Sequence, residues 1–590
     1  MTQTSFPSTL VESYVYDAIG NLTSKTDRKA QTINYVYDAL SRLTHKGYPD
    51  ATGVDYVYDL AGKIKQVTDP TGVYGSAYDN MGRLVGTSTQ YAFIPGQTFS
   101  NTYAYDAGSK RTSFTSPHGG TDTYAYDTVS QLTSITDSAT GQFTFGYDAL
   151  GRRTALNRPN GVNTSYGYNS LSRLLSVLHQ NGATTLDGAG YTYDNAGNRT
   201  AKTNYLNSTT EQYTYDAIYQ LTQVVQGATT TESYSYDAVG NRLSSLGMSP
   251  YAYNSSNQLT ATPAATFTYD GNGNTLTKVD SSGTTMYTWD FENRLSSVVL
   301  PASAGTVTFK YDPFGRRLQK GSSVGIKNYL YDGSNSVEEI DQTGTLLARY
   351  AQGTGIDEPI GESRGAASGF YEQDGLGSVT SLSSFAGALV DTYTYNSFGA
   401  STASTGTLLN PFQYTGRDFD SETGIQYYQA RYYDSVNGRF INEDRVRFKG
   451  GINFYRYVNN NPVNLVDPFG DGPLTWGFKC LMFRYYYGRC AASALPCKER
   501  LASAPAINPN AWQVGEGDLA GQLANARNGQ GTGFESCMNL SECMAKEPAC
   551  IKMAEYAVKC GGWAIDSAGS FMPALKPIMK GLLDKVKGVP

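Results

Sequence analysis

The sequence predicts an all-β repeat protein, in which a ribbon of antiparallel β-hairpins coils along most of the chain. Three observations predict it. A Tyr-x-Tyr-Asp motif recurs at regular intervals, the 590 residues include 47 Tyr and 63 Gly, and all seven cysteines lie between residues 480 and 560. Tyr and Gly recurring together indicate many short strands joined by turns. The separate cysteine-rich region indicates a second, small and mainly helical C-terminal domain.

The repeat unit is visible in three copies near the start of the chain, "YVYDAIGNL", "YVYDALSRL" and "YVYDLAGKI". Their aspartates, Asp17, Asp38 and Asp59, are spaced 21 residues apart. Later copies begin at Tyr124, Phe145, Tyr166, Tyr191, Tyr213, Tyr234 and Phe309. A chain this long can fold without one large core because each repeat buries its apolar face on its neighbours.

Each part of the unit has a structural role. The two tyrosines lie on one face of a strand because side chains alternate with period two. The aspartate ends the strand and can accept hydrogen bonds from backbone that follows it. The glycine three places later, such as Gly20, suits a left-handed turn, and Ser41 or Asn257 replaces it in other copies. About 21 residues therefore make one hairpin, and the twist of the strands coils the ribbon.

The row of tyrosines has two interpretations. The first is structural packing between repeats, since tyrosine adds a large buriable ring with a polar tip. The second is an aromatic platform that binds carbohydrate. The formal net charge of −6 predicts neither nucleic-acid binding by the repeats nor attraction to a membrane.

The sequence contains no standard export or membrane signal. The N-terminal residues "MTQTSFPSTLVESYVYDAIG" lack a basic stretch followed by an apolar one. No apolar run approaches the ~18 residues that span a bilayer. If the protein leaves the cell, we expect a route that this sequence does not encode.

Two long segments after the repeats carry a family resemblance. They are "FYEQDGLGSVTSLSSFAGALVDTYTYNSFGA", and "GRDFDSETGIQYYQARYYDSVNGRFINED" followed by "GGINFYRYVNNNPVNLVDPFG". With the repeats, they resemble RHS proteins, bacterial polymorphic toxins related to toxin-complex C subunits and teneurins. The resemblance covers about four-fifths of the 590 residues. It implies a hollow β-shell of YD repeats over residues 1–335, an RHS-associated core closing the shell over 336–470, and a variable effector over 471–590.

The resemblance also implies a location, partners and a reaction. The protein would be secreted from a bacterium or attached to its surface, by a route without a standard signal peptide. The C-terminal effector would be enclosed as cargo, and an immunity protein and secretion-system proteins would be further partners. In relatives, a pair of aspartates assisted by an arginine releases the effector by cutting the chain. The matching residues here are Asp444, Asp467 and Arg439. Two carboxyls held close together share one proton, so that one acts as a base and the other as an acid. The expected cleavage region is Gly470, Asp471 and Gly472.

Two residues depart from the family pattern at this site. Asp444 is followed by Arg445 where relatives have proline, and Asp471 stands where they have a large apolar residue. The alternative is that Asp444 and Asp467 only anchor turns, since an aspartate before a proline such as Pro468 often starts one.

The tail over 471–590 carries no recognisable active site. It has no His, no C-x-x-C pair and no phosphate-binding loop, so we predict no metal or cofactor. Its cysteines suggest disulfides with one free thiol. The basic, amphipathic stretch over 571–589 either packs on its own domain or meets a membrane.

The favoured function is therefore a polymorphic toxin whose shell encloses, and cuts off, an effector. Two alternatives stay open. The first is a non-enzymatic, extracellular or cell-surface protein that binds carbohydrate or a partner cell. The second is a truncated RHS remnant, because the chain begins almost within a repeat.

Overall fold

The computed structural model describes residues 2–356 and 358–472. The cysteine-rich tail and its expected helices therefore lie outside the described residues. Strands dominate the described part, which otherwise contains three single turns of 3-10 helix, η1 (Tyr414–Gly416), η2 (Arg447–Lys449) and η3 (Val458–Asn460). None of its helices has the length and apolar character needed to cross a membrane. The predicted all-β architecture is confirmed.

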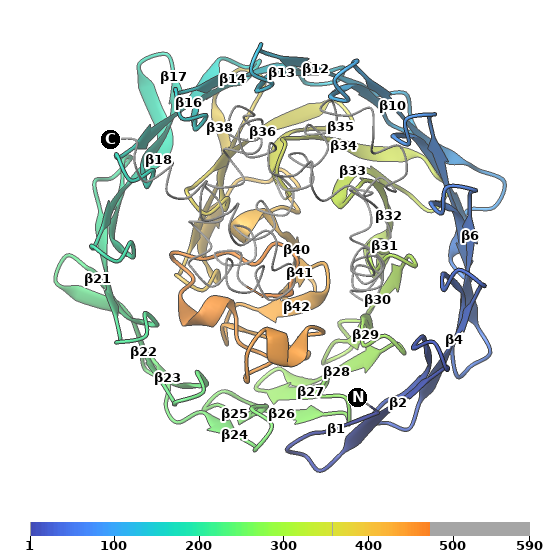
Figure 1. Ribbon diagram of the computed structural model, residues 1–590. Coiled ribbons are helices and arrows are strands. Elements are labelled where there is room, and N and C mark those ends of the chain that lie inside the picture. Colours follow the sequence, from blue (N-terminus) through green and yellow to red (C-terminus); the bar gives the residue numbers. More distant parts are fainter. Residues whose placement is uncertain (1, 357, 473–590) are drawn as a thin grey trace, which may run out of the picture. The chain divides into compact units, whose positions relative to one another are not determined.

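The strands form a ribbon in which each pairs antiparallel with the next along the chain. The first series runs from β1 (Gln3–Ser5), β2 (Val11–Tyr16) and β3 (Leu22–Thr26) to β23 (Arg242–Ser245). The second runs from β24 (Ala252–Tyr253) to β39 (Ser401–Thr405). In Figure 1 the first series makes an outer ring and the second continues inside it, so the ribbon is a spiral of two circuits.

The repeated motif builds the turn at the end of each hairpin. Asp148 Oδ1 accepts hydrogen bonds from the N–H groups of Leu150 at 2.9 Å and Arg152 at 3.0 Å. Its Oδ2 pairs with Nε of Arg152 at 2.6 Å. Gly151 adopts the left-handed conformation with φ of +73°, as predicted for the repeat. The expected replacements Ser41 and Asn257 adopt it as well, at +58° and +59°.

In many repeats the second tyrosine of the motif ties neighbouring hairpins together. The hydroxyl of Tyr58 donates to the carbonyl oxygen of Leu43 at 2.8 Å, and that of Tyr168 to Arg153 at 2.9 Å. A cation packs on the ring as well, with Arg42 Cζ lying 4.7 Å from the centroid of Tyr58. Because these rings and hydroxyls are engaged within the wall, they act as structural packing.

The two circuits touch along their length, and the inner one is shorter. Arg28 contacts Asn272, which lies 244 residues further along the chain. Near the other end, the N–H of Ser397 donates to Glu232 at 2.9 Å across only 165 residues. The falling separation means that each hairpin of the inner circuit faces more than one hairpin of the outer circuit, so the spiral tightens as it proceeds.

The last described segment forms a small domain inside the ring (Figure 1), called here the core. Its strands are β40 (Asp418–Asp420), β41 (Ile425–Tyr428), β42 (Arg431–Asp434) and β43 (Arg439–Phe440). One buried cluster joins the core to both circuits through Tyr213, Tyr234, Phe398, Tyr428, Tyr433, Phe440 and Tyr457. The core thus braces the wall from within.

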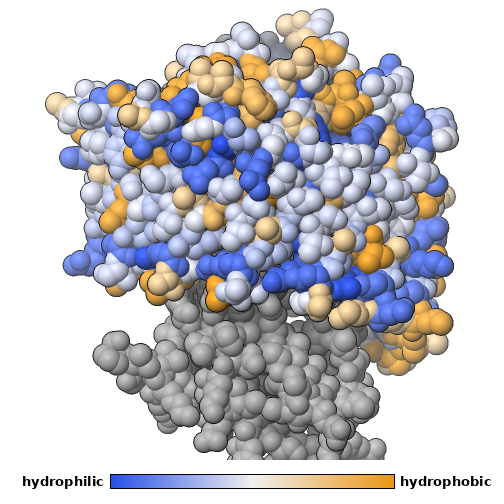
Figure 2. Space-filling model, turned by 90° about the horizontal axis from the view of Figure 1, so that it is seen from above, coloured by the Kyte–Doolittle hydropathy of each residue, from blue (hydrophilic) through white to orange (hydrophobic). Residues whose placement is uncertain are grey.

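The predicted boundary between the YD repeats and the RHS-associated core lies between residues 335 and 336. The ribbon runs across it without a break, because β33 (Asn335–Ile340) pairs with both its neighbours. That division remains a prediction. Seen from the side in Figure 2, the wall is mostly hydrophilic or neutral, with hydrophobic patches near its edges. Exposed apolar side chains two places after the aspartate or asparagine of the motif include Ile19, Leu40, Met81, Val129, Leu150, Leu171 and Ile218.

Candidate functional site

The structure brings Asp444 and Asp467 together around one arginine, Arg431, at the start of β42. Nη2 of Arg431 lies 3.3 Å from Oδ2 of Asp444 and 3.2 Å from Oδ2 of Asp467. Both aspartates are buried, with 5% and 1% of their surfaces exposed. Shared pairing with one guanidinium offsets part of the cost of burying two carboxylates side by side.

Asp444 is held by the loop that follows β43. Its own N–H donates to the carbonyl oxygen of Phe454 at 3.0 Å, and its carbonyl accepts from the N–H of Arg447 at 3.0 Å. Oδ1 accepts from the N–H of Val446 at 2.8 Å. Burial raises the pKa of Asp444, although Arg431 and the Val446 bond oppose the rise. The carboxyl therefore has a fixed direction and a perturbed affinity for its proton.

Asp467 holds the backbone of the expected cleavage region. Its Oδ1 accepts from the N–H of Asp471 at 3.1 Å, and its Oδ2 accepts from the N–H of Gly472 at 2.9 Å. Burial raises the pKa of Asp467 to about 6, against the opposing effects of Arg431 and the Gly472 bond. Nε of Arg431 also donates to the carbonyl oxygen of Gly470. All three residues of the expected region thus contact this site directly or through their neighbours.

Arg439, matched in the sequence analysis to the assisting arginine, points elsewhere. Its Nη2 donates to the carbonyl oxygen of Asn257 at 2.6 Å, and its Cζ lies 4.9 Å from the ring centroid of Tyr455. The cause is strand alternation: β42 and β43 pair Tyr433 with Phe440 and Asp434 with Arg439. Side chains paired across strands share a face, so Arg439 faces away from Phe440.

Arg431 lies two residues before Tyr433 and therefore shares the face of Phe440. The structure agrees, because Arg431 Cζ lies 3.5 Å from the ring centroid of Phe440. Sequence reasoning missed Arg431. The alternation within "ARYYDSVNGRF" was the available signal, since it separates the two arginines by face once the hairpin register is known.

The two residues that depart from the family pattern meet each other. Nε and Nη2 of Arg445 lie 2.7 and 2.6 Å from Oδ1 and Oδ2 of Asp471. The pair links the Asp444 loop to the backbone just after Gly470. Asp471 thus has a cationic partner of its own, as Asp444 and Asp467 have in Arg431.

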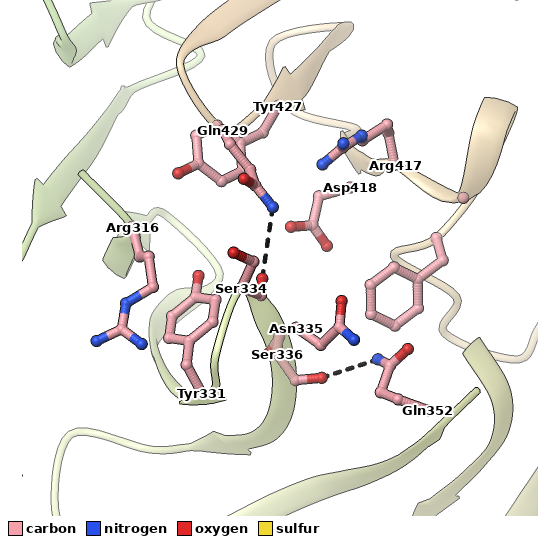
Figure 3. A pocket seen from close by; sticks show the side chains of 12 residues that line it. Arg316, Tyr331, Ser334, Asn335, Ser336, Gln352, Arg417, Asp418, Tyr427 and Gln429 are labelled. Carbon is pink, nitrogen blue, oxygen red and sulfur yellow. Dashed lines mark hydrogen bonds between the residues drawn. The ribbon is translucent and has the colours of Figure 1, made fainter. Parts of the chain in front are cut away.

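Two of the cavities in the described part of the chain adjoin the core. Figure 3 shows the smaller, about 30 Å³, between the inner circuit and the core, where Gln429 donates to Ser334 at 3.5 Å and Gln352 to Ser336 at 2.9 Å. It has room for about one or two water molecules. The larger, about 330 Å³, is lined in part by Asp467. Among residues 2–356 and 358–472, no three His, Cys, Asp or Glu side chains are grouped as metal ligands.

The spiral of tyrosine–aspartate hairpins, closed by an inner core, defines the class of protein as a YD-repeat shell. The family model described as Teneurin YD-shell matches residues 3–148 and 201–463, and the RHS Repeat model matches residues 147–185. The chain belongs to the teneurin YD-shell family. The resemblance to RHS proteins is thereby confirmed.

Several known proteins are similar to this chain. The tRNA3(Ser)-specific nuclease WapA of Bacillus spizizenii is 31% identical over 235 residues, which are 38% of this chain and 10% of the nuclease. Toxin subunit YenC2 of Yersinia entomophaga is 41% identical over 70 residues, 12% of this chain and 7% of YenC2. The chain thus spans about a tenth of the length of these relatives. The crystal structure of TcdB2-TccC3-Cdc42 shares the fold, with a TM-score of 0.68 and 19% identity over 78% of this chain and 27% of that one.

Proposed function

We propose that this chain is an RHS-type polymorphic toxin of a bacterium, in which the β-shell encloses a C-terminal effector over residues 471–590 and the core cuts the chain beside Gly470. One observation carries the proposal. Asp467 accepts hydrogen bonds from the N–H groups of Asp471 and Gly472. Arg431 pairs with both Asp467 and the buried Asp444, and it donates to the carbonyl oxygen of Gly470. A pair of aspartates that merely anchored turns would not need to share a buried arginine. The similarity to a nuclease and to a toxin subunit supports delivery of the effector outside the producing cell.

The geometry favours hydrolysis of the Gly470–Asp471 peptide bond. A water oxygen attacks the carbonyl carbon of Gly470 while ionised Asp444 takes the proton of the water. Nε of Arg431 donates to the Gly470 oxygen and stabilises the negative charge that develops there. Before the reaction, Oδ1 of Asp467 accepts the N–H of Asp471 at 3.1 Å, so this carboxyl already lies beside the leaving nitrogen. Once the attack makes that nitrogen pyramidal and basic, Asp467 in its protonated form gives it a proton as the C–N bond breaks. The products are a carboxyl terminus at Gly470 and an amine at Asp471.

Self-cleavage is tested on the full 63.9 kDa chain by gel electrophoresis and sequencing of the tail fragment. The wild type should give two fragments, the smaller beginning at Asp471. Asp444→Asn and Asp467→Asn should remain intact. Asp420→Asn is the matched control, because Asp420 is a core aspartate that is 1% exposed and pairs with Arg317 at 2.6 Å, away from the site. A wild type that stays intact, or an Asp467→Asn chain that is cut normally, contradicts the proposal.

The activity of the effector is a separate question. Expression of residues 471–590 alone should arrest bacterial growth in either the cytosol or the periplasm, and co-expression of a cognate immunity protein should restore it. Harmless expression in both compartments would remove the toxin proposal while leaving self-cleavage untouched.

A further inference from the structure

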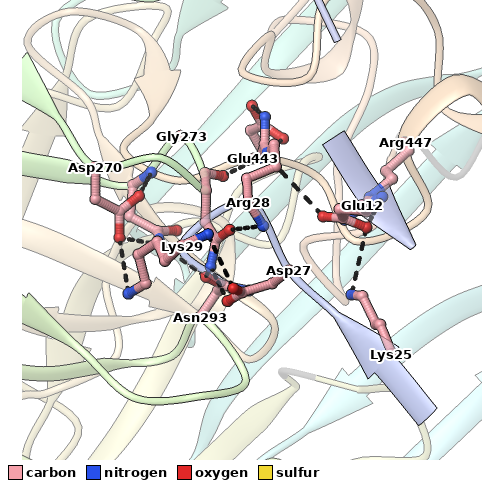
Figure 4. Close-up of polar contacts among 12 residues, drawn as sticks. Glu12, Lys25, Asp27, Arg28, Lys29, Asp270, Gly273, Asn293, Glu443 and Arg447 are labelled. Atoms are coloured by element: carbon pink, nitrogen blue, oxygen red, sulfur yellow. Dashed lines mark hydrogen bonds and ion pairs between the residues drawn. The ribbon is translucent and has the colours of Figure 1, made fainter. Parts of the chain in front are cut away.

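The loop that carries Asp444 is bonded on both sides to the first hairpins of the chain. Figure 4 shows the contacts. Before Asp444, Glu443 accepts hydrogen bonds from Nη1 and Nη2 of Arg28 at 3.1 and 2.7 Å. After it, Arg447 pairs through both terminal nitrogens with Glu12, including Nη1 to Oε2 at 2.5 Å. Glu12 lies on β2, 435 residues before its partner Arg447. Arg28 follows β3 and lies 415 residues before its partner Glu443.

These contacts are buried, which makes them strong and directional. The side chains of Arg28 and Glu12 are each 2% exposed, and that of Glu443 is 9% exposed. Burial opposes ionisation of Glu12, but the hydrogen bond from Arg447 and the charges of Lys25 and Arg447 hold its pKa below the usual value. Removing one partner of such a pair leaves a buried charge uncompensated.

An apolar contact reinforces the same connection. Phe6, just after β1, is buried in one cluster with Phe454 and Tyr455 of the core. The Cζ atoms of Arg28 and Arg447 lie 4.1 and 5.2 Å from its ring centroid. Phe454 supplies the carbonyl that accepts the N–H of Asp444. Three neighbours of the candidate catalytic carboxyl thus rest on the first hairpins.

The first hairpins occupy this place at the point where the outer circuit closes on itself. The backbone N–H of Arg28 donates to Oδ1 of Asn272 at 3.2 Å, and Lys29 pairs with Asp270 at 3.2 Å, at the point where the inner circuit begins. The side chain of Asn272 in turn donates to Asp27 at 2.6 Å. Arg28 therefore contacts the closing seam of the spiral and the Asp444 loop at the same time.

We propose that Glu12 and Arg28 are positioning residues that make self-cleavage depend on closure of the shell. This inference rests on the proposed function. When the circuit is open, Glu443 and Arg447 lose their partners, and the loop no longer holds Asp444 against Arg431. When the circuit closes, the loop is fixed and Asp444 reaches its working position. The effector is then cut free only from a chain whose shell is complete.

The test follows the appearance of the tail fragment over time in chains made by cell-free translation. Glu12→Gln and Arg28→Met should slow cleavage by roughly tenfold or more, as expected for loss of a buried charged hydrogen bond at a reacting group. Arg111→Met is the matched control, because Arg111 also bridges the two circuits, to Asp332 at 2.5 Å and 221 residues away, without touching the loop. It should cleave at the wild-type rate.

A second variant separates positioning from simple unfolding. Arg28→Lys keeps a positive charge beside Glu443, so it should retain at least part of the cleavage rate that Arg28→Met loses. Resistance of the shell to added protease is measured on every variant. Wild-type cleavage rates in both Glu12→Gln and Arg28→Met, or equal slowing in Arg111→Met, would overturn the inference. A wild type that never cleaves would instead overturn the proposed function.

Discussion

Arg445 and Asp471 form a bidentate ion pair beside the proposed cleavage site, with contacts of 2.7 and 2.6 Å. Each residue alone departs from the family pattern, yet the two departures compensate one another. The Arg445 side chain is 66% exposed, so the pair lies at the surface. The pair holds the backbone after Gly470 near the loop of Asp444, so in the proposed reaction we expect it to contribute by alignment.

Breaking this pair should slow cleavage only modestly. Surface ion pairs contribute about 0.2–1 kcal/mol, so Arg445→Gln or Asp471→Asn should reduce the cleavage rate by a factor of about 1.4 to 5. The rate of the wild type, but not of either variant, should fall as salt is added, because exposed pairs are screened. Time courses at low and high ionic strength measure both effects. An identical salt dependence in all three chains would contradict this role.

The two core arginines should differ sharply when each is changed to methionine. Arg431→Met leaves Asp444 and Asp467 buried without their cation, which should destabilise the shell by about 3–5 kcal/mol and abolish cleavage. Arg439→Met loses one hydrogen bond to a backbone carbonyl and keeps its apolar packing, so cleavage should continue. Thermal unfolding and gel analysis of both variants provide the comparison. If Arg439→Met alone stops cleavage, the assignment of Arg431 is wrong.

Asp467 should make the stability of the shell depend on pH. Its folded-state pKa of about 6 lies above the usual 3.8, so between those values the folded state keeps a proton that the unfolded state has lost. Stability from this group is complete below about pH 4 and is lost as the pH rises through 6, by up to about 3 kcal/mol. Asp467→Asn removes this dependence.

The measurement compares melting temperatures of the wild type and Asp467→Asn between pH 4 and 8, in an Asp444→Asn background that prevents cleavage. Subtracting one curve from the other cancels other buried acids, such as Glu362 and Glu372, whose pKa values burial raises to about 7. The melting temperature of the chain that keeps Asp467 should fall relative to that of the Asp467→Asn chain as the pH rises to about 6. Above that pH the difference between the two melting temperatures should stay constant. A flat difference would show that Asp467 titrates normally.

Local features of this fold follow from the sequence because they depend on neighbours within one repeat. The aspartate turn, the left-handed Gly151 and the alternating tyrosines each need only a few adjacent residues. The paired aspartates Asp444 and Asp467 could be named because each lies in a long motif that resembles those of RHS proteins. The choice between Arg431 and Arg439 required the register of β42 and β43, and a one-residue difference there reverses the face.

Contacts between distant parts of the chain could not be predicted in the same way. Arg28 contacts Glu443 of the core across 415 residues. Which hairpins face one another, and which face the core, depends on how many repeats complete one circuit. That number is set by the accumulated twist of all the strands, which no single motif contains. The tightening of the spiral from a separation of 244 residues to one of 165 is likewise a property of the whole ribbon.

Gly470 should be required at the proposed cleavage site for two reasons: its backbone is left-handed, and a side chain there would clash with a neighbouring carbonyl group. Gly424 provides a matched control. Both have left-handed backbones, with φ of +67° and +71°, so alanine at either costs about 1–2 kcal/mol of strain. An added Cβ at Gly424 meets no atom within 4 Å, whereas at Gly470 it would lie 2.4 Å from the carbonyl oxygen of Tyr428. Gly470→Ala should therefore displace the Gly470 carbonyl from Arg431 and slow cleavage, while Gly424→Ala should lower the melting temperature and leave cleavage intact. Equal cleavage rates in the two variants would mean that the position of the Gly470 carbonyl does not control the reaction.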